Sequence, residues 1–407
     1  MSEIEDRLAE IRSRGLYRRL RVVSGPQGPR VLLDGRPVLL LCSNNYLGLA
    51  DHPTVREAAA EAAMRYGAGA GASRLISGNM TIHRRLEERL AEFHGSEACL
   101  LLGSGYLANV GVISTLAGEG DVVFSDALNH ASIIDGCRLA RADTFVYDHA
   151  DVEQLEWGLR QAAGRGSLIV TDGLFSMDGD VAPIEEIVEL AARYDARVMV
   201  DEAHAIGTFG PGGRGTVAAA GIEDEVDVIV GTLGKALGSY GAYVACDMQM
   251  AKYLVNSTRT LIFSTALPPS AAAAAGAALQ LLREQPRRVD KLRRNAEALR
   301  DELELQGLPS PSRTQVVPLL IGDPDAAVEA SERALEQGIF AQAIRPPTVP
   351  AGTSRLRLSV MASHTPSELR EAARTLAAAL PPAARGLARL PSDGGDPRVF
   401  DALRDAA

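Results

Sequence analysis

Short apolar runs alternate with segments of helical periodicity through most of the chain. The apolar, strand-like runs fall at 98–102, 121–124, 144–147, 167–171, 197–200 and 226–230. Between most of them, apolar residues recur three or four positions apart, for example at 152–163 and 184–194. Continuous apolar strands that alternate with helices are typical of a parallel sheet covered on both faces. The pattern therefore predicts an α/β fold with a large, mainly parallel sheet.

The regions before and after this alternation carry other patterns. Residues 1–20 predict a charged amphipathic helix, and Asp34-Gly35 predicts a hairpin turn between strands at 30–33 and 37–41. A helix-rich stretch at 269–306 precedes predicted strands at 316–321, 339–344 and 355–360 and helices at 325–337 and 366–379. We expect an N-terminal helix and hairpin arm (1–50), a large domain (51–285), a small C-terminal α/β domain (286–380) and a Pro/Gly-rich tail (381–407).

Composition and charge narrow the function classes. The chain has 407 residues, 46% hydrophobic and 23% charged, with a formal net charge of -10. This acidity argues against a general binder of nucleic acid or anionic membranes, which select basic surfaces. The first residues lack the apolar core of a secretory signal, and no run approaches the ~20 apolar residues of a membrane span. The four scattered cysteines predict no metal or disulfide framework, so we expect a cytoplasmic protein without a metal site.

Lysine is scarce in this chain. It has three lysines, Lys235, Lys252 and Lys291, among 42 basic residues. Lys235 lies in a Gly-rich loop, in the segment GTLGK. Because most basic residues of the chain are arginines, the lysine in this loop favours a role that needs an amine. Chance retention of the lysine is the alternative.

Asp201 and Lys235 follow two successive predicted strands. Ligands bind at the carboxyl ends of strands in open parallel sheets, so these two side chains should meet in one crevice. A carboxylate that keeps a pyridine nitrogen protonated and an amine that forms an imine are what pyridoxal phosphate (PLP) requires. Taken singly, Asp201 could be a helix N-cap and Lys235 a solvated loop residue. Their combination favours PLP chemistry.

Other strand ends could complete such a site. Gly105 and Tyr106 lie in GSGYLAN, where a helix should begin after the strand 98–102, and helix N-termini bind phosphate. An ordinary strand-to-helix turn is the alternative. Thr232 and Ser176 add hydroxyl groups at two further strand ends, and the ring of His130 could stack on a flat cofactor.

A resemblance to a known family rests on six segments. They read CSNNYLGL at 42–49, GASRLISG at 71–78, DALNHAS at 126–132, DGLFSMDGD at 172–180, DEAH at 201–204 and GTLGK at 231–235. With them the chain resembles the α-oxoamine synthases over residues 16–380. The resemblance implies a type I fold of PLP-dependent transferases, with a large parallel-sheet domain and a small C-terminal α/β domain. It also implies that an amino acid condenses with an acyl-CoA to give an aminoketone, CoA and CO₂.

The resemblance implies catalytic roles for four residues. Lys235 would be the Schiff-base lysine and Asp201 the partner of the pyridine nitrogen. His130 would stack on the ring, and His204 would bond the phenolic oxygen of PLP. The further cofactor contacts that it implies are Gly105, Tyr106, Ser176 and Thr232.

The resemblance also implies substrate and subunit contacts. Asn44 and Arg357 match residues that bind the amino-acid carboxylate. The pair Ser264-Thr265 matches a segment that reaches the PLP phosphate of the neighbouring subunit, which implies a homodimer with shared active sites.

One segment bears on the substrate. AIRPPTVPAGTSRLR at 343–357, which contains Arg345 and Thr348, resembles family members that use L-alanine and a pimeloyl thioester. Arg18 could pair with the distal carboxylate of such a chain, or it could be a surface arginine. A glycine-using member of the family and a PLP-fold subunit without activity are the alternatives, and retention of Lys235 counts against the second.

Overall fold

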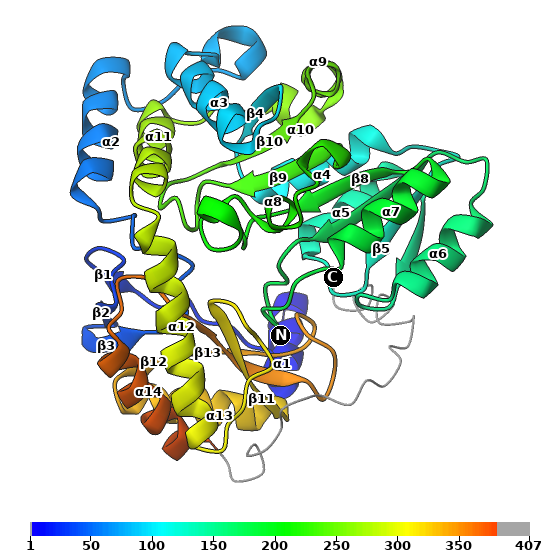
Figure 1. Ribbon diagram of the computed structural model, residues 1–407. Helices are drawn as coiled ribbons and strands as arrows, with labels where there is room; N and C mark the ends of the chain where they lie inside the picture. Colours follow the sequence, from blue (N-terminus) through cyan, green and yellow to red (C-terminus); the bar gives the residue numbers. More distant parts are fainter. Residues whose placement is uncertain (1, 381–407) are drawn as a thin grey trace. The chain divides into compact units, whose positions relative to one another are not determined.

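The computed structural model describes residues 2–380, so the predicted tail at 381–407 lies outside the described residues (Figure 1). The described chain forms two compact units. The larger unit contains residues 45–176 and 180–290. The smaller unit contains residues 2–44, 177–179 and 291–380, so the N-terminal arm belongs to the same unit as the C-terminal segment.

A seven-stranded sheet forms the centre of the larger unit. Its strands, in spatial order, are β4 (Ala98–Leu102), β10 (Ala242–Cys246), β9 (Val228–Thr232), β8 (Arg197–Asp201), β7 (Ser167–Asp172), β5 (Val122–Asp126) and β6 (Asp143–Tyr147). The pairs from β9 to β6 are parallel, whereas β10 runs antiparallel to both of its neighbours. The fold class predicted from the apolar runs is confirmed.

Helices bury both faces of this sheet because its strands alternate apolar side chains between the faces. Val228 and Val230 pack with one set of helices, whereas Ile229 packs with another. The first set is α4 (Gly105–Leu116), α5 (Ala131–Ala140), α9 (Met248–Ser257) and α10 (Arg259–Ile262). The second is α6 (Val152–Gln161), α7 (Ile184–Tyr194) and α8 (Thr216–Ala220). The remaining helices of this unit are α2 (Pro53–Tyr66), α3 (Thr81–His94) and α11 (Pro269–Glu284).

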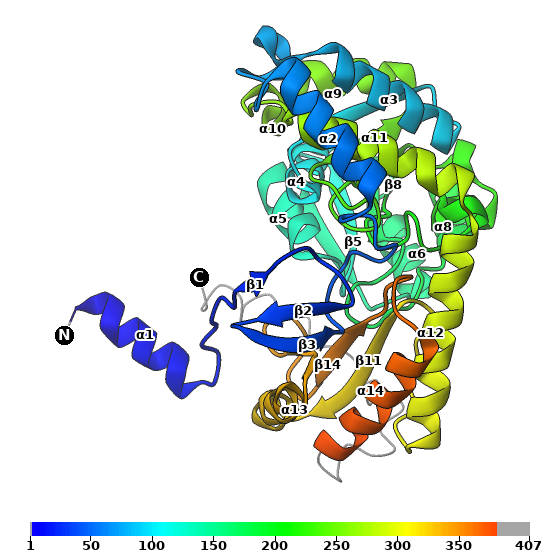
Figure 2. The ribbon, with the colours of Figure 1, turned by 90° about the vertical axis from the view of Figure 1, so that its left-hand side faces the viewer.

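Two small sheets build the smaller unit. One contains β1 (Val23–Ser24), β2 (Arg30–Leu33), β3 (Arg36–Leu40) and β12 (Ile339–Phe340), and the other contains β11 (Val316–Gly322), β14 (Ser354–Ser359) and β13 (Gln342–Ile344). Its helices are α1 (Glu3–Ser13), α13 (Pro324–Glu336), α14 (Pro366–Ala379) and most of α12 (Arg287–Leu305). Figure 2 shows α13 and α14 beside these strands. Across residues 2–380, no helix is both long and apolar enough to cross a membrane.

Several details of the sequence prediction were wrong. The N-terminal helix ends at Ser13 instead of residue 20. The strand predicted at 339–344 is two strands in different sheets, because the chain changes neighbours after Phe340. The strand predicted at 226–230 is shifted to Val228–Thr232, because both ladders of β9 begin at Val228 and the ladder with β10 continues to Thr232.

Candidate active site

The carboxyl ends of several strands align at one edge of the large sheet. Leu102 at the end of β4 and Thr232 at the end of β9 both pair with Ala242 of β10. Asp201, the last residue of β8, pairs with Asp172, the last residue of β7. The loops that leave these strands therefore begin side by side, as the prediction for Asp201 and Lys235 requires.

The loop after β9 presents Lys235, which is half-buried. Its Nζ lies 2.7 Å from His204 Nε2, and His204 Nδ1 lies 2.7 Å from the hydroxyl oxygen of Tyr46. His204 and Tyr46 are both buried. The amine is therefore held by an imidazole ring that is itself hydrogen-bonded on its other nitrogen.

Asp201 is buried and fixed by two donors. Asn109 Nδ2 donates to its Oδ2 at 2.6 Å, and the backbone N–H of Ala203 donates to its Oδ1 at 2.8 Å. The same Asn109 amide donates to Ser132 Oγ at 2.8 Å, and Ser132 Oγ lies 2.7 Å from His130 Nδ1. A buried carboxylate and an imidazole are thus joined through two side chains of α4 and α5.

His130 keeps an exposed face beside this cluster. Partial burial lowers the pKa of His130 and the charge of Lys235 lowers it further, while the carboxylate of Asp201 raises it. The net direction is downward, so the ring favours the neutral form. A neutral, exposed imidazole at the edge of the sheet can stack on a flat ligand.

Asp172 is a second buried carboxyl group at this edge. Burial raises the pKa of Asp172 well above its usual value, and the charge of Asp201 raises it further. The backbone N–H of His130 donates to Asp172 Oδ2 at 2.7 Å and stabilises the charged form. Asp172 therefore holds the backbone of His130 in place.

The N-terminus of α4 is a candidate anion site. Ser104 caps this helix, with its Oγ accepting from the N–H of Leu107 at 3.2 Å. The first N–H groups of a helix have no partner within the helix and attract phosphate. Apart from its chain neighbours and the backbone of its own helix, no atom lies within 4 Å of a Cβ placed on Gly105, so the space beside this residue is open. Tyr106 is half exposed and its hydroxyl donates to Asp135.

Two further predicted cofactor contacts lie at the same strand ends. Thr232 is buried, its Oγ1 donates to the carbonyl of Gly241 at 3.2 Å, and it accepts from the N–H of Gly234. Ser176 is buried in the loop after β7. Thr232 is the last residue of β9 and lies three residues before Lys235 in the chain.

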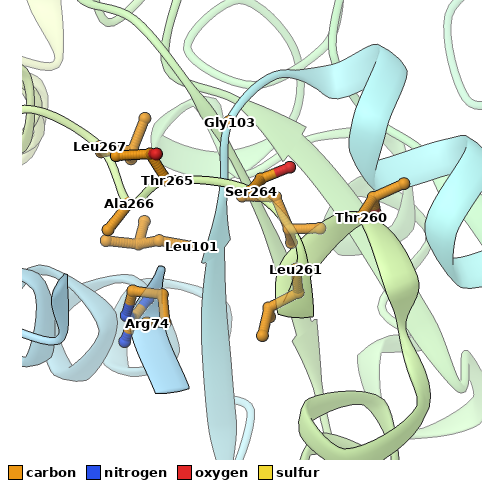
Figure 3. A pocket seen from close by; sticks show the side chains of 10 residues that line it. Arg74, Leu101, Gly103, Thr260, Leu261, Ser264, Thr265, Ala266 and Leu267 are labelled. Carbon is orange, nitrogen blue, oxygen red and sulfur yellow. The ribbon is translucent and has the colours of Figure 1, made fainter. Parts of the chain in front are cut away.

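Ser264 and Thr265 lie on the segment between α10 and α11. They line a cavity of about 10 Å³ together with Gly103 and Arg74 (Figure 3). Such a volume holds about one water and is too small for a phosphate. Thr265 is exposed, and it forms an isolated β-bridge with Ser73.

The smaller unit holds the predicted substrate contacts. Arg357 is buried on β14 and donates to Asn44 Oδ1 at 3.2 Å and to Ser359 Oγ at 2.8 Å. Arg345 donates to the carbonyl of Gly15. Burial lowers the pKa of Arg345, and the nearby charge of Arg18 lowers it further. The structure thus brings Asn44 to Arg357, and Arg18 to Arg345.

Thr348 shares the turn of Arg345. Its N–H donates to the Arg345 carbonyl at 3.1 Å, and its side chain is exposed.

Sequence reasoning did not select Tyr46, Asn109, Ser132 or Asp172 as site residues. Tyr46, Ser132 and Asp172 lie inside the segments that carried the family resemblance, and Asn109 is the last residue of the segment GSGYLAN. The available signal was a polar residue at a strand end or in an apolar helix, as with Asn109 in α4.

Comparison with protein families places the chain in a class of enzymes. The model of the aminotransferase class I and II family matches residues 36–376. The chain belongs to this family.

The similar curated proteins are more specific. 8-Amino-7-oxononanoate synthase from Citrifermentans bemidjiense is 52% identical over 377 residues, which cover 92% of this chain and 97% of the relative. The 8-amino-7-oxononanoate synthase of Lysinibacillus sphaericus is 49% identical over 364 residues, with 89% and 94% covered.

Solved structures agree with this family. Serine palmitoyltransferase from S. paucimobilis, with PLP–myriocin bound, has a TM-score of 0.88 and 34% identity, with 92% of this chain and 96% of that chain covered. 8-Amino-7-oxononanoate synthase from Francisella tularensis has a TM-score of 0.73 and 26% identity, with 84% and 97% covered. The resemblance to the α-oxoamine synthases predicted from the sequence is confirmed.

Proposed function

We propose that this chain is a PLP-dependent 8-amino-7-oxononanoate synthase of biotin biosynthesis. It condenses L-alanine with a pimeloyl thioester of CoA or of a carrier protein. The products are 8-amino-7-oxononanoate, the free thiol and CO₂. The observation that carries the proposal is the alignment of Lys235 and Asp201 at one sheet edge, in a chain 52% identical to such synthases over 92% of its length.

The donor set at the sheet edge fits PLP. Lys235 supplies an amine for its aldehyde, Asp201 an anion for its pyridine nitrogen, and the N-terminus of α4 a set of N–H groups for its phosphate. The open space at Gly105 leaves room for that phosphate. Bound PLP supplies an electron sink for the negative charge that develops at the α-carbon of the amino acid.

The protein's own groups do the rest of the work. Asn109 and the N–H of Ala203 fix the Asp201 carboxylate, so that its charge is already oriented when a ligand binds. Lys235 Nζ takes and returns a proton at the α-carbon, as a positioned amine does in general acid–base catalysis. The exposed ring of His130 covers one face of the ligand and excludes water from it.

Arg357 is the proposed anchor for the alanine carboxylate. A guanidinium binds a carboxylate through two parallel N–H bonds. Its hydrogen bonds to Asn44 and Ser359 fix the direction of that fork within the smaller unit. Asn44 thereby orients Arg357.

Arg18 and Arg345 are the proposed site for the distal carboxylate of the acyl chain, with Thr348 in the adjacent turn. Two close guanidinium groups repel each other, and each lowers the cost of binding an anion near the other. Burial is the main cause of the lowered pKa of Arg345, and the charge of Arg18 lowers this pKa further. A pimeloyl chain ends in such an anion, whereas acetyl and palmitoyl chains do not.

A homodimer with shared active sites completes the proposal, in which Ser264-Thr265 contacts the phosphate bound by the partner. The exposure of Thr265 leaves its side chain accessible to a partner subunit and so supports this role. A cytoplasmic location is part of the same proposal.

The test is a rate comparison with purified protein and added PLP. L-Alanine with pimeloyl-CoA should release CoA faster than glycine with acetyl-CoA and faster than L-serine with palmitoyl-CoA. The serine arm is included because the serine palmitoyltransferase structure has the higher TM-score of the two solved relatives. A faster rate in either competing arm would contradict the proposed substrates.

Arg18→Ala is the variant for the acyl site. One charge-assisted hydrogen bond contributes about 1.5–3 kcal/mol, so kcat/KM for pimeloyl-CoA should fall about ten- to a hundredfold. The KM for alanine should not change. Arg19→Ala, at the neighbouring exposed position, is the matched control.

A further inference from the structure

A row of three hydrogen-bonded side chains runs from Tyr46 through His204 to Lys235. The Tyr46 hydroxyl oxygen lies 2.7 Å from His204 Nδ1, and His204 Nε2 lies 2.7 Å from Lys235 Nζ. Tyr46 is 0% exposed. The two ring centroids are 6.0 Å apart and tilted by 57°, so the contact runs through the hydroxyl group and not through stacked rings.

The hydrogen atoms along this row have two possible arrangements. A neutral imidazole carries one N–H, and the bond made by one ring nitrogen sets which nitrogen has it. When the Lys235 ammonium donates to Nε2, the hydrogen is on Nδ1 and Tyr46 accepts. When Nε2 carries the hydrogen and donates to an acceptor in the site, Nδ1 must accept and Tyr46 donates.

A tyrosine hydroxyl suits both arrangements because it donates one hydrogen bond and also accepts. A carboxylate in its place would only accept and would favour a charged imidazolium. A phenylalanine can neither donate nor accept, so it would remove this hydrogen bond from a buried ring nitrogen, which costs free energy.

We propose that Tyr46 is a positioning residue that keeps His204 Nδ1 hydrogen-bonded in either tautomer. His204 Nε2 can then accept from free Lys235 and donate to the cofactor when Lys235 is bound to it. The inference rests on the proposed function, because only a lysine that is linked to and released from a cofactor requires both states. Tyr46 itself contacts neither substrate nor cofactor in this scheme.

The chain offers a matched control. The hydroxyl of Tyr243 lies 2.8 Å from His94 Nε2, and both residues are buried. Burial lowers the pKa of His94 to about 4, so this imidazole is neutral at neutral pH. Tyr243→Phe removes the same kind of bond as Tyr46→Phe, but from His94 and not from His204, which contacts Lys235.

The first measurement uses the apoprotein and needs no activity. In protein labelled with ¹⁵N-histidine, the His204 resonances are assigned by their loss in His204→Gln. Wild-type apoprotein should carry the hydrogen on Nδ1, and borohydride fixation of PLP on Lys235 should move it to Nε2. Tyr46→Phe should shift the Nδ1 resonance and leave His94 unchanged, and Tyr243→Phe should do the reverse. Identical His204 resonances in wild type and Tyr46→Phe would overturn the proposal.

The second measurement separates positioning from folding. Tyr46→Phe should reduce kcat about ten- to a hundredfold, the usual effect of losing a group that orients a site residue, with KM for alanine changed less than about twofold. Tyr243→Phe should stay within about threefold of wild type, and an equal loss in both variants would refute the role. If the wild type makes no product from alanine and pimeloyl-CoA, the proposed function fails, while the apoprotein spectra still decide the hydrogen bond.

Discussion

Asp201 and Glu202 are adjacent buried carboxyl groups with different surroundings. Asp201 accepts from Asn109 and from a backbone N–H, as a fixed anion should. Glu202 Oε1 accepts from Thr216 Oγ1 and the N–H of Val217, both at 2.8 Å, while its buried Oε2 has no hydrogen-bond partner among the described residues. Burial raises the pKa of Glu202 to about 7 from a usual value of 4.5. Glu202 can therefore carry a proton under conditions where an exposed glutamate would not.

This difference predicts a pH dependence of stability. Glu202 binds its proton more tightly in the folded than in the unfolded chain, so the free energy of unfolding should fall as pH rises from about 4.5 to about 7. Glu202→Gln keeps an acceptor for Thr216 and cannot ionise, so this fall should become smaller. Urea unfolding of both proteins at pH 5 and pH 8 measures it, with exposed Glu61→Gln as the control. A pH dependence unchanged in Glu202→Gln would contradict the assignment.

The site could be predicted only where local signals exist. Asp201 and Lys235 were predicted because each follows an apolar strand, and the order of strands then brings them together. Tyr46 could not be predicted as their neighbour, because 158 residues separate it from His204 and no local pattern encodes that contact. Asn109 was inconspicuous for a related reason: it is a polar residue in an apolar helix, and its partner Asp201 is 92 residues away.

At the scale of elements, burial decided which predictions succeeded. The strand 98–102 and the helix 184–194 have the predicted bounds because their patterns are strong and their ends carry turn residues. The antiparallel strand β10 was missed, although its five residues, AYVAC, form an apolar run like those of the predicted strands. β10 nevertheless aligns the ends of β4 and β9, so that the phosphate end and the lysine end of the candidate site depend on it.

The packing of α10 on α4 gives a prediction at this scale. A Cβ on Gly111 in α4 would overlap Thr260 Oγ1, which donates to the carbonyl of Leu107 at 2.8 Å. Although alanine favours helix, Gly111→Ala should destabilise the protein by about 1–3 kcal/mol because the site is already filled. Thermal unfolding measures the change.

Gly276→Ala in α11 is the matched control. Its Cβ would meet Arg89 Nη1 at 3.6 Å, an ordinary contact with a flexible side chain. Here the helix preference of alanine should dominate and stabilise the protein by about 0.5–1 kcal/mol. Equal effects of the two substitutions would mean that the contact with Thr260 does not govern this packing.

For the whole molecule, exposed apolar side chains gather near the proposed shared segment. Ile76 is 80% exposed and Phe263 is 72% exposed, and both lie next to the Ser73–Thr265 bridge in the chain. Large apolar side chains grouped on a surface are typical of protein–protein interfaces. They support a homodimer in which Thr265 meets the partner.

Complementation between two inactive variants tests this sharing of sites. If Thr265 serves the partner's site, a mixed dimer of Lys235→Ala and Thr265→Ala chains has one site with both changes and one site with neither. Such dimers, purified with two affinity tags, should regain about half of the wild-type activity per dimer at limiting PLP, because one of two symmetric sites is intact. If Thr265 serves its own chain, the mixed dimer has one site without the lysine and one without the threonine, and its activity cannot exceed that of the Thr265→Ala parent. Light scattering should give twice the mass of one chain for each preparation, and a single-chain mass at full activity would exclude the shared site altogether.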